Sequence, residues 1–169
     1  MKIYLARHGQ TNYNDLGLCN SDPTVDVHLT EEGEMQAATL TRALRGIPLE
    51  RIFVSELKRT QQTAIIVNSL HEVTIEVSPL LNDHLSGFEG QPAELLMSSL
   101  DAADNRWTAS FNHGESIEDM KARVAKFLEE LKTKPYEDVL IITSEWVIYA
   151  LIALLNNVPN EQAWLTKVK

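Results

Sequence analysis

Polar side chains follow the apolar runs that predict buried strands, and their types suit chemistry on a phosphoryl group. Arg7 and His8 come directly after an apolar run near the N-terminus, and Arg59 follows a second run. Arginine side chains match phosphate oxygens with paired hydrogen bonds, and a neutral imidazole is a nucleophile near pH 7. Asp83 follows a third run and carries a carboxyl group of the kind that protonates a leaving oxygen. The combination favours phosphoryl transfer.

The elements that must position these side chains follow a βαβα pattern. Apolar runs rich in β-branched residues predict strands at 2–6, 51–55, 73–77 and 139–143. Their near-continuous apolarity indicates burial on both faces of a parallel sheet. Ligands of such sheets bind beyond the carboxyl ends of the strands, where the polar residues stand. We therefore expect these residues to meet at one edge of the sheet.

Longer stretches with apolar residues every three or four positions predict the helices. They cover about 30–44, 56–70, 116–131 and 147–156, with a shorter helix near 93–100. Thr30 and Ser116 are suitable N-caps, and Asp119 stands three residues after Ser116 as in a capping box. The remaining long irregular region, 79–112, is of a length that is usually functional.

Composition bounds the classes of protein to which the chain can belong. Its 169 residues are 44% hydrophobic and 23% charged, as in an ordinary globular protein, and fit a single domain over 1–169. The net charge of −9 opposes binding to nucleic acid. The longest apolar stretch, 139–155, is interrupted by Thr143, Ser144 and Glu145, so it predicts a buried strand and helix and no membrane span. A lone cysteine, Cys19, and a short apolar run at 3–6 that does not resemble a secretory signal favour a cytoplasmic location.

Five sequence stretches together resemble the histidine phosphatase superfamily, also called phosphoglycerate mutase-like. They are LARHGQTNYN at 5–14, LTEEGEMQA at 29–37, SELKRTQQTA at 55–64, LNDHLSGFEG at 81–90 and HGES at 113–116. They occur in the family's order. The resemblance implies a three-layer α/β/α sandwich with a mostly parallel central sheet. It also implies one histidine-phosphatase-like domain and a phosphohistidine intermediate, with no metal and no cofactor.

The resemblance assigns a role to each matching residue. His8 corresponds to the nucleophile and Asp83 to the general acid, while Arg7, Arg59 and Asn14 correspond to residues that bind the phosphoryl oxygens. An aspartic acid in water is ionised at pH 7. The acid role therefore requires burial, or the charge of a bound phosphate, to keep a proton on Asp83.

One residue of the family pattern is missing. After the last strand the family has Ser or Thr followed by His, Gly and Gly, whereas this chain reads Thr143, Ser144, Glu145 and Trp146. Ser144 stands where a second histidine donates a charged hydrogen bond, and no histidine follows His113. A serine hydroxyl donates one hydrogen bond without a positive charge. Loss of one preorganised donor costs about 10²- to 10³-fold in rate.

These residues support two candidate functions, one of an enzyme and one of a binding protein. The favoured one is a phosphatase that hydrolyses a small phosphomonoester and is weakened by Ser144. Hydrolysis is favoured over mutase action because the region between Asp83 and Ser116 is short, whereas the mutases that the chain resembles have larger insertions. The alternative is a degenerate member that binds a phosphorylated ligand or protein without turnover. The expected partner of the favoured function is a small phosphorylated substrate or an inorganic oxyanion.

Other histidines and aromatic residues admit less specific interpretations. His28, His71, His84 and His113 lack a compact metal-ligand spacing, so a metal site is disfavoured. Trp107 and Phe111 could equally line a substrate pocket or cover the core beneath the long irregular region.

Overall fold

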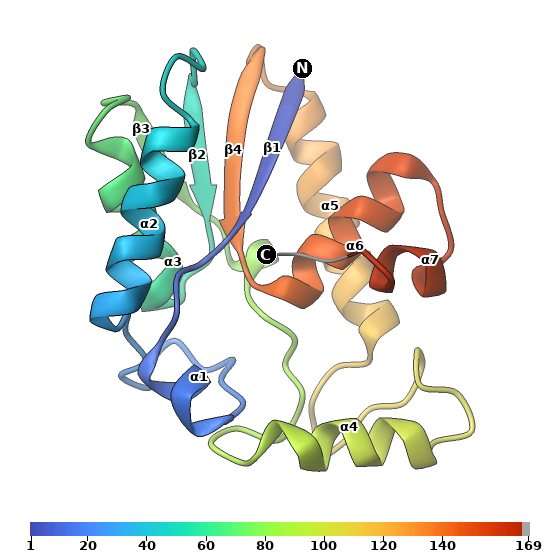
Figure 1. Cartoon of the computed structure of the whole chain (residues 1–169). Helices are drawn as coiled ribbons and strands as arrows, with labels where there is room; N and C mark the ends of the chain where they lie inside the picture. Colours follow the sequence, from blue (N-terminus) through green and yellow to red (C-terminus); the bar gives the residue numbers. More distant parts are fainter. Residues whose placement is uncertain (167–169) are drawn as a thin grey trace.

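The fold has a parallel sheet between two helical layers. A computed structural model describes residues 1–166; residues 167–169 of the expected domain lie outside the described part. Within residues 1–166, four strands form one all-parallel sheet in the order β1-β4-β2-β3 (Figure 1). They are β1 (Lys2–Arg7), β2 (Arg51–Val54), β3 (Thr74–Val77) and β4 (Asp138–Thr143). The predicted α/β class, with a parallel central sheet, is confirmed.

Strand β4 lies inside the sheet and sets the register of its neighbours. All six of its residues are buried, as its sequence DVLIIT predicts. It pairs Arg7 of β1 with Thr143, and Val54 of β2 with Ile142. This register brings the carboxyl ends of β1, β2 and β4 to the same level. The residues that follow these strands are therefore neighbours in space.

Helices cover both faces of the sheet. Alternate residues of β4 point to opposite sides, Val139 and Ile141 into one apolar cluster and Leu140 and Ile142 into the other. The first cluster packs beneath α5 (Ile117–Lys132) and α6 (Glu145–Asn156), and the second beneath α2 (Glu31–Ala43) and α3 (Lys58–Asn68). The shorter elements are α1 (Asn12–Leu16), the 3₁₀ helix η1 (Pro79–Leu81), α4 (Ala93–Ala102) and α7 (Asn160–Trp164). Helices α1 and α4 lie beyond the carboxyl ends of the strands (Figure 1).

The helix starts follow from local cap chemistry. The Thr30 hydroxyl accepts a hydrogen bond from the Gly33 amide at 3.1 Å. Ser116 and Asp119 form the predicted capping box, each side chain accepting from the other's backbone amide at 3.1 Å.

Three short elements, α1, η1 and α7, were not predicted, and helices α3, α4 and α6 have boundaries two residues away from those predicted. Helix α3 begins at Lys58, not at 56, and ends at Asn68. Helix α6 begins at Glu145, two residues earlier than predicted, because Ser144 already has the extended backbone of an N-cap. The apolar stretch 139–155 divides into β4 and α6 as predicted, and none of the helices in residues 1–166 has the length and apolarity to cross a bilayer.

The turn after β1 packs directly against the first turn of α2 through two glycines. A Cβ atom on Gly9 would lie 2.3 Å from the Gly33 carbonyl oxygen, and one on Gly33 would lie 2.1 Å from the Gln10 carbonyl oxygen. Both obstacles are backbone atoms that cannot rotate away. Only glycine permits this approach, which holds the segment after β1 in place.

We predict that Gly33→Ala destabilises the protein, although alanine is ordinarily the better helix former. The added methyl forces α2 away from the turn at Gln10, at a cost of about 1–3 kcal/mol in the free energy of unfolding. Denaturant unfolding measures this cost, with Glu34→Ala, at an exposed position of α2, as the control. Equal or greater stability of Gly33→Ala would contradict the contact.

Candidate active site

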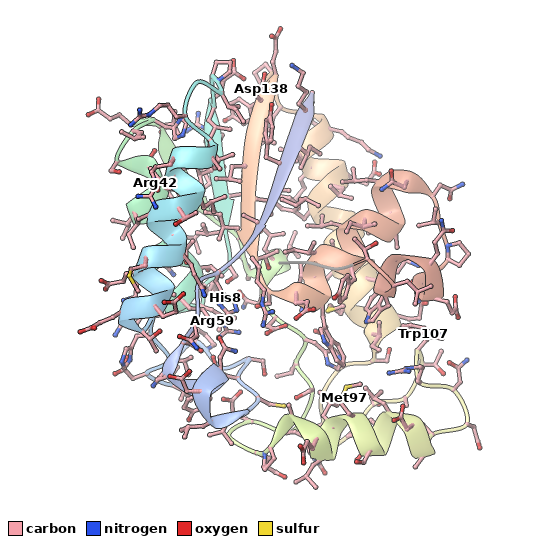
Figure 2. All side chains as sticks on the ribbon, in the orientation of Figure 1. His8, Arg42, Arg59, Met97, Trp107 and Asp138 are labelled. Carbon is pink, nitrogen blue, oxygen red and sulfur yellow. The ribbon has the colours of Figure 1, made fainter. Side chains whose placement is uncertain are left out.

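The six residues predicted to act on a phosphoryl group line one cavity beyond the carboxyl ends of the strands. The cavity has a volume of about 190 Å³. Its lining includes the six predicted residues Arg7, His8, Asn14, Arg59, Asp83 and Ser144. Figure 2 shows His8 and Arg59 at this end of the sheet, with Met97 on α4 across from them. The fold therefore brings together residues that are far apart in the sequence.

The hydrogen bonds of His8 determine which ring nitrogen carries the proton. Nδ1 lies 2.8 Å from the Gly9 carbonyl oxygen, which can only accept, so the proton of the neutral ring is on Nδ1. Nε2 then carries the lone pair, and it accepts a hydrogen bond from Arg59 Nε at 3.0 Å. Burial, assisted by the Arg59 guanidinium, lowers the pKa of His8 to about 3. The imidazole is thus neutral at pH 7, with a lone pair in the cavity.

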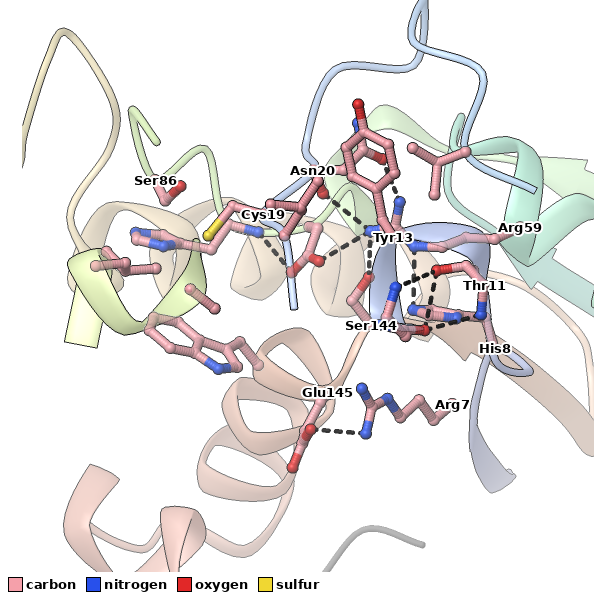
Figure 3. A pocket seen from close by; sticks show the side chains of 18 of the residues that line it. Arg7, His8, Thr11, Tyr13, Cys19, Asn20, Arg59, Ser86, Ser144 and Glu145 are labelled. Carbon is pink, nitrogen blue, oxygen red and sulfur yellow. Dashed lines mark hydrogen bonds and ion pairs between the residues drawn. The ribbon is translucent and has the colours of Figure 1, made fainter. Parts of the chain in front are cut away.

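The guanidinium of Arg59 is the centre of the site. It is almost fully buried, and Figure 3 shows its hydrogen bonds to the residues around it. Besides His8, it donates to the Asn20 side-chain oxygen, to the Asn20 carbonyl at 3.0 Å, to Asp83 Oδ2 at 2.9 Å and to Ser144 Oγ at 3.3 Å. Burial lowers the pKa of Arg59, and the nearby Asp83 carboxylate opposes this effect. Four segments of the chain converge on one cation.

Asp83 is fixed through both carboxylate oxygens. Oδ2 accepts from Arg59, and Oδ1 accepts from the backbone amide of His84 at 2.8 Å. The His84 ring stacks on Trp146 with 5.1 Å between the ring centres, and its Nε2 lies 2.8 Å from the Glu115 carbonyl oxygen. The acid loop is therefore tied to α6 as well as to Arg59.

Arg7 is paired with a carboxylate inside the site. Its Nη1 lies 2.8 Å from Oε2 of Glu145, and both side chains are about one-third exposed at the cavity (Figure 3). Tyr149 donates a hydrogen bond to the other oxygen of Glu145 at 2.5 Å. Burial and this bond raise the pKa of Tyr149 to about 12, so the phenol keeps its proton. Glu145 thus places an anion on Arg7, one of the two arginines that line the cavity.

Ser144 and Asn14 occupy different settings in the cavity. Ser144 is buried, stands at the N-cap of α6 and faces Arg59. Asn14 lies in the first turn of α1, where its oxygen accepts from the Thr11 amide at 3.0 Å while the Thr11 hydroxyl accepts from the Asn14 amide at 3.1 Å. This capping box fixes the Asn14 side chain at the rim of the cavity.

Sequence reasoning missed several residues that build the site. Thr63 lies one helical turn after Arg59 on α3, and its hydroxyl accepts from the Gly9 amide at 3.2 Å. That spacing is visible in the sequence. Glu89 accepts hydrogen bonds from the Ser21 amide at 2.7 Å and from Asn20 Nδ2 at 2.8 Å, and so presents Asn20 to Arg59. No local pattern marks Asn20, because its position depends on a carboxylate distant in the sequence.

The aromatic residues Trp107 and Phe111 of the irregular region do not pack at the cavity. The Trp107 ring contacts Trp164 with 5.2 Å between ring centres, and Phe111 contacts Phe88 at 5.7 Å. Both cover the apolar cluster beneath α5 and α6 and are not among the residues that line the cavity. Among residues 1–166, no group of three or more histidine, cysteine, aspartate or glutamate side chains is arranged to hold a metal ion.

Comparison with known proteins identifies the family. Residues 3–169 match the profile of the histidine phosphatase superfamily (branch 1). The chain belongs to this superfamily. The family predicted from the five motifs is therefore confirmed.

Relatives of this superfamily member include named phosphatases. The adenosylcobalamin/alpha-ribazole phosphatase of Escherichia coli is 30% identical over 175 residues, covering 99% of this chain and 85% of that protein. Phosphoserine phosphatase 1 of Hydrogenobacter thermophilus is 27% identical over 171 residues, covering 97% of this chain and 80% of that protein. The crystal structure of the alpha-ribazole phosphatase from Shigella flexneri superposes with a TM-score of 0.86 at 30% identity, covering 100% of this chain and 86% of that one.

We predict that Glu145→Gln strengthens oxyanion binding by this superfamily member. The glutamine oxygen can accept from Arg7 and the glutamine amide can donate to the Tyr149 hydroxyl, but the charge that competes with an incoming anion is removed. Partly exposed ion pairs contribute up to about 1 kcal/mol, so the affinity for vanadate should rise about two- to fivefold. Titration followed by histidine NMR measures the affinity, and Arg7→Ala should weaken binding.

The matched control is Glu129→Gln, which removes an exposed carboxylate on α5 that pairs with Lys132. It lowers the overall negative charge by the same amount and should leave the affinity unchanged. An equal gain in both variants would mean that overall charge, and not the contact with Arg7, governs binding.

Proposed function

We propose that this protein hydrolyses a small phosphomonoester through a phosphohistidine formed on His8. The observation that carries the proposal is the lone pair on His8 Nε2, which faces the cavity because Nδ1 is held by the Gly9 carbonyl. Asp83 lines the same cavity, and the two residues share Arg59 as a hydrogen-bonding partner. The proposed nucleophile and acid thus both contact the guanidinium of Arg59, whose donors suit a phosphate group.

In the first step Nε2 attacks phosphorus while the ester oxygen leaves. A bond forms between Nε2 and phosphorus, the bond between phosphorus and the ester oxygen breaks, and the leaving oxygen takes a proton from Asp83. Arg59 turns its donors from Nε2 and the carboxylate to the phosphoryl oxygens, which have the stronger negative charge. Asp83 must carry a proton for this step and is a carboxylate after it.

In the second step water releases the phosphate. The Asp83 carboxylate accepts a proton from a water molecule, whose oxygen attacks phosphorus as the bond to Nε2 breaks. The two arginines and the positive end of the α6 dipole, which begins at Ser144, stabilise the charge on the phosphoryl oxygens. Ser144 donates one hydrogen bond in place of the charged histidine, so the reaction is slower by about 10²- to 10³-fold.

The walls of the cavity support a small substrate. Besides the polar residues, the lining includes apolar and sulfur-containing side chains, among them Leu18, Cys19, Leu96, Met97 and Trp146. A volume of about 190 Å³ suits a short leaving group attached to the phosphate. The relatives named as alpha-ribazole and phosphoserine phosphatases also suggest a small phosphorylated substrate. We place the reaction in the cytoplasm, where a lone cysteine stays reduced.

The contact between Arg7 and Glu145 favours a second candidate function. An anion built into the site occupies a donor that phosphate would use. A degenerate member of the superfamily would then bind a phosphorylated ligand or protein through Arg59 and His8 without completing turnover. The experiments below separate the two functions.

We predict that turnover forms a phosphohistidine and is lost in His8→Ala. Phosphohistidine is acid-labile, so the intermediate is trapped by alkaline quenching and located by mass spectrometry during hydrolysis of an aryl phosphate. His71→Ala, which removes a histidine that does not line the cavity, is the matched control and should keep full activity. A chelator should leave the rate unchanged, because His8 and Asp83 supply nucleophile and acid. Activity that survives in His8→Ala, or that requires added zinc or magnesium, would contradict this mechanism.

We also predict that Ser144→His with Glu145→Gly raises activity by about 10- to 10³-fold. The change restores a charged donor beside Arg59 and frees Arg7. Trp146 is kept because its stacking on His84 supports the acid loop. The single variant Glu145→Gly separates the effect of freeing Arg7 from that of the new histidine. If the folded double variant hydrolyses no phosphomonoester across a panel, the function without turnover takes the place of the phosphatase.

A further inference from the structure

The loop that carries Asp83 is held by side chains through its backbone carbonyls. Arg123, on α5, donates from Nη1 to the Leu80 carbonyl and from Nη2 to the Asp83 carbonyl, both at 2.9 Å. The Thr143 hydroxyl donates to the Leu81 carbonyl at 2.7 Å. The loop and the short helix η1 that precedes it, which includes Leu80 and Leu81, lie outside the strands, so these donors take the place of a sheet ladder. Of Arg123 and Thr143, only Arg123 reaches the backbone of Asp83 itself.

Arg123 is in turn fixed by Glu115. Its Nη2 lies 2.6 Å from Glu115 Oε1, its Nε lies 3.0 Å from Oε2, and both side chains are less than one-fifth exposed. Glu115 also binds the other end of the loop, because Oε1 accepts from the Leu85 amide at 3.0 Å and its own amide donates to the Leu85 carbonyl at 2.7 Å. The ion pair thus clamps the chain on both sides of Asp83.

The residue that holds the backbone of Asp83 is different from the groups that contact its carboxylate. Arg123 contacts the Asp83 carbonyl and leaves the carboxylate to Arg59 and the His84 amide. Glu115 pairs with Arg123 and balances its positive charge. The planar, rigid fork of arginine suits this task better than the flexible ammonium of lysine.

We propose that Arg123 is a positioning residue that holds Asp83 at the distance needed to protonate the leaving group. This inference rests on the proposed function. A general acid must lie within hydrogen-bonding reach of the leaving oxygen, and a displacement of about 1 Å costs about 10²-fold in rate. The ion pair of Arg123 with Glu115 can fix this distance, because Arg123 lies on the rigid helix α5.

Helix α5 has anchors of its own, so Arg123 can be replaced without unfolding the domain. Its buried face carries Ile117, Met120, Val124, Phe127, Leu128 and Leu131. Arg123→Met keeps the aliphatic stem and removes the donors. Lys121→Met is the matched control on the same helix, since Lys121 donates to Asn160 and does not line the cavity. Arg123→Lys keeps the positive charge and tests whether the paired donors of the guanidinium are required.

The decisive measurement compares two leaving groups. A nitrophenolate leaves without a proton, whereas an alkoxide needs one from Asp83. We expect Arg123→Met to lower kcat/KM about 10- to 100-fold for an alkyl phosphate and less than threefold for nitrophenyl phosphate. Asp83→Asn should show the same selectivity, and the double variant should lose little more than Asp83→Asn alone. Lys121→Met should lower neither rate, and Arg123→Lys should fall between wild type and Arg123→Met. Equal losses on both substrates, or multiplying losses in the double variant, would overturn the proposal.

Hydrogen exchange supplies a second test that does not depend on turnover. The His84 amide donates to Asp83 Oδ1 and reports the position of the acid. Its exchange should accelerate at least tenfold in Arg123→Met, while the amides within α5 stay protected. In Lys121→Met the His84 amide should stay as protected as in the wild type. Unchanged protection of His84 would overturn the positioning role. A failure of the proposed function would be recognised separately, as activity that persists in His8→Ala.

Discussion

The buried guanidinium of Arg59 is the interaction on which the site depends. A buried cation is costly unless its donors are satisfied, and here the turn after β1, the segment at Asn20, the acid loop and the start of α6 all provide acceptors. In the proposed function the same donors bind the phosphoryl group. The acceptors that satisfy Arg59 therefore include the residues to which the proposed function assigns the reaction, His8 and Asp83.

Two features of the scaffold make this convergence possible. The register of β4 brings the ends of β1 and β2 to one level. The contact between Gly9 and Gly33 then lets the segment after β1 lie against α2, and Thr63 holds the Gly9 amide from α3. His8 is therefore fixed by backbone contacts as well as by its own hydrogen bonds. These contacts favour the tautomer with the proton on Nδ1.

The residues after β4 give the site a different charge balance from that of the family pattern. Where that pattern has a charged histidine and two glycines, Ser144 contributes a neutral hydroxyl, Glu145 pairs with Arg7, and Trp146 stacks on His84. Each replacement has partners in the structure, so the three form a packed arrangement and not an isolated defect. In the proposed function this local packing lowers the positive charge available to a phosphate, while His8, Arg59 and Asp83 still line one cavity.

The sequence by itself determined the parallel α/β class, the caps at Thr30 and Ser116, and the six residues that meet in the cavity. These depend on periodicity, cap chemistry and motif order, which are readable along the chain. Only the tertiary structure decided that Glu145 contacts Arg7, that Asn20 binds Arg59, and that Arg123 holds the acid loop. Such contacts join residues far apart in sequence, and they arise from the paths of irregular segments. Those paths are set by distant side chains, such as Glu89 and Glu115, and no local pattern encodes them.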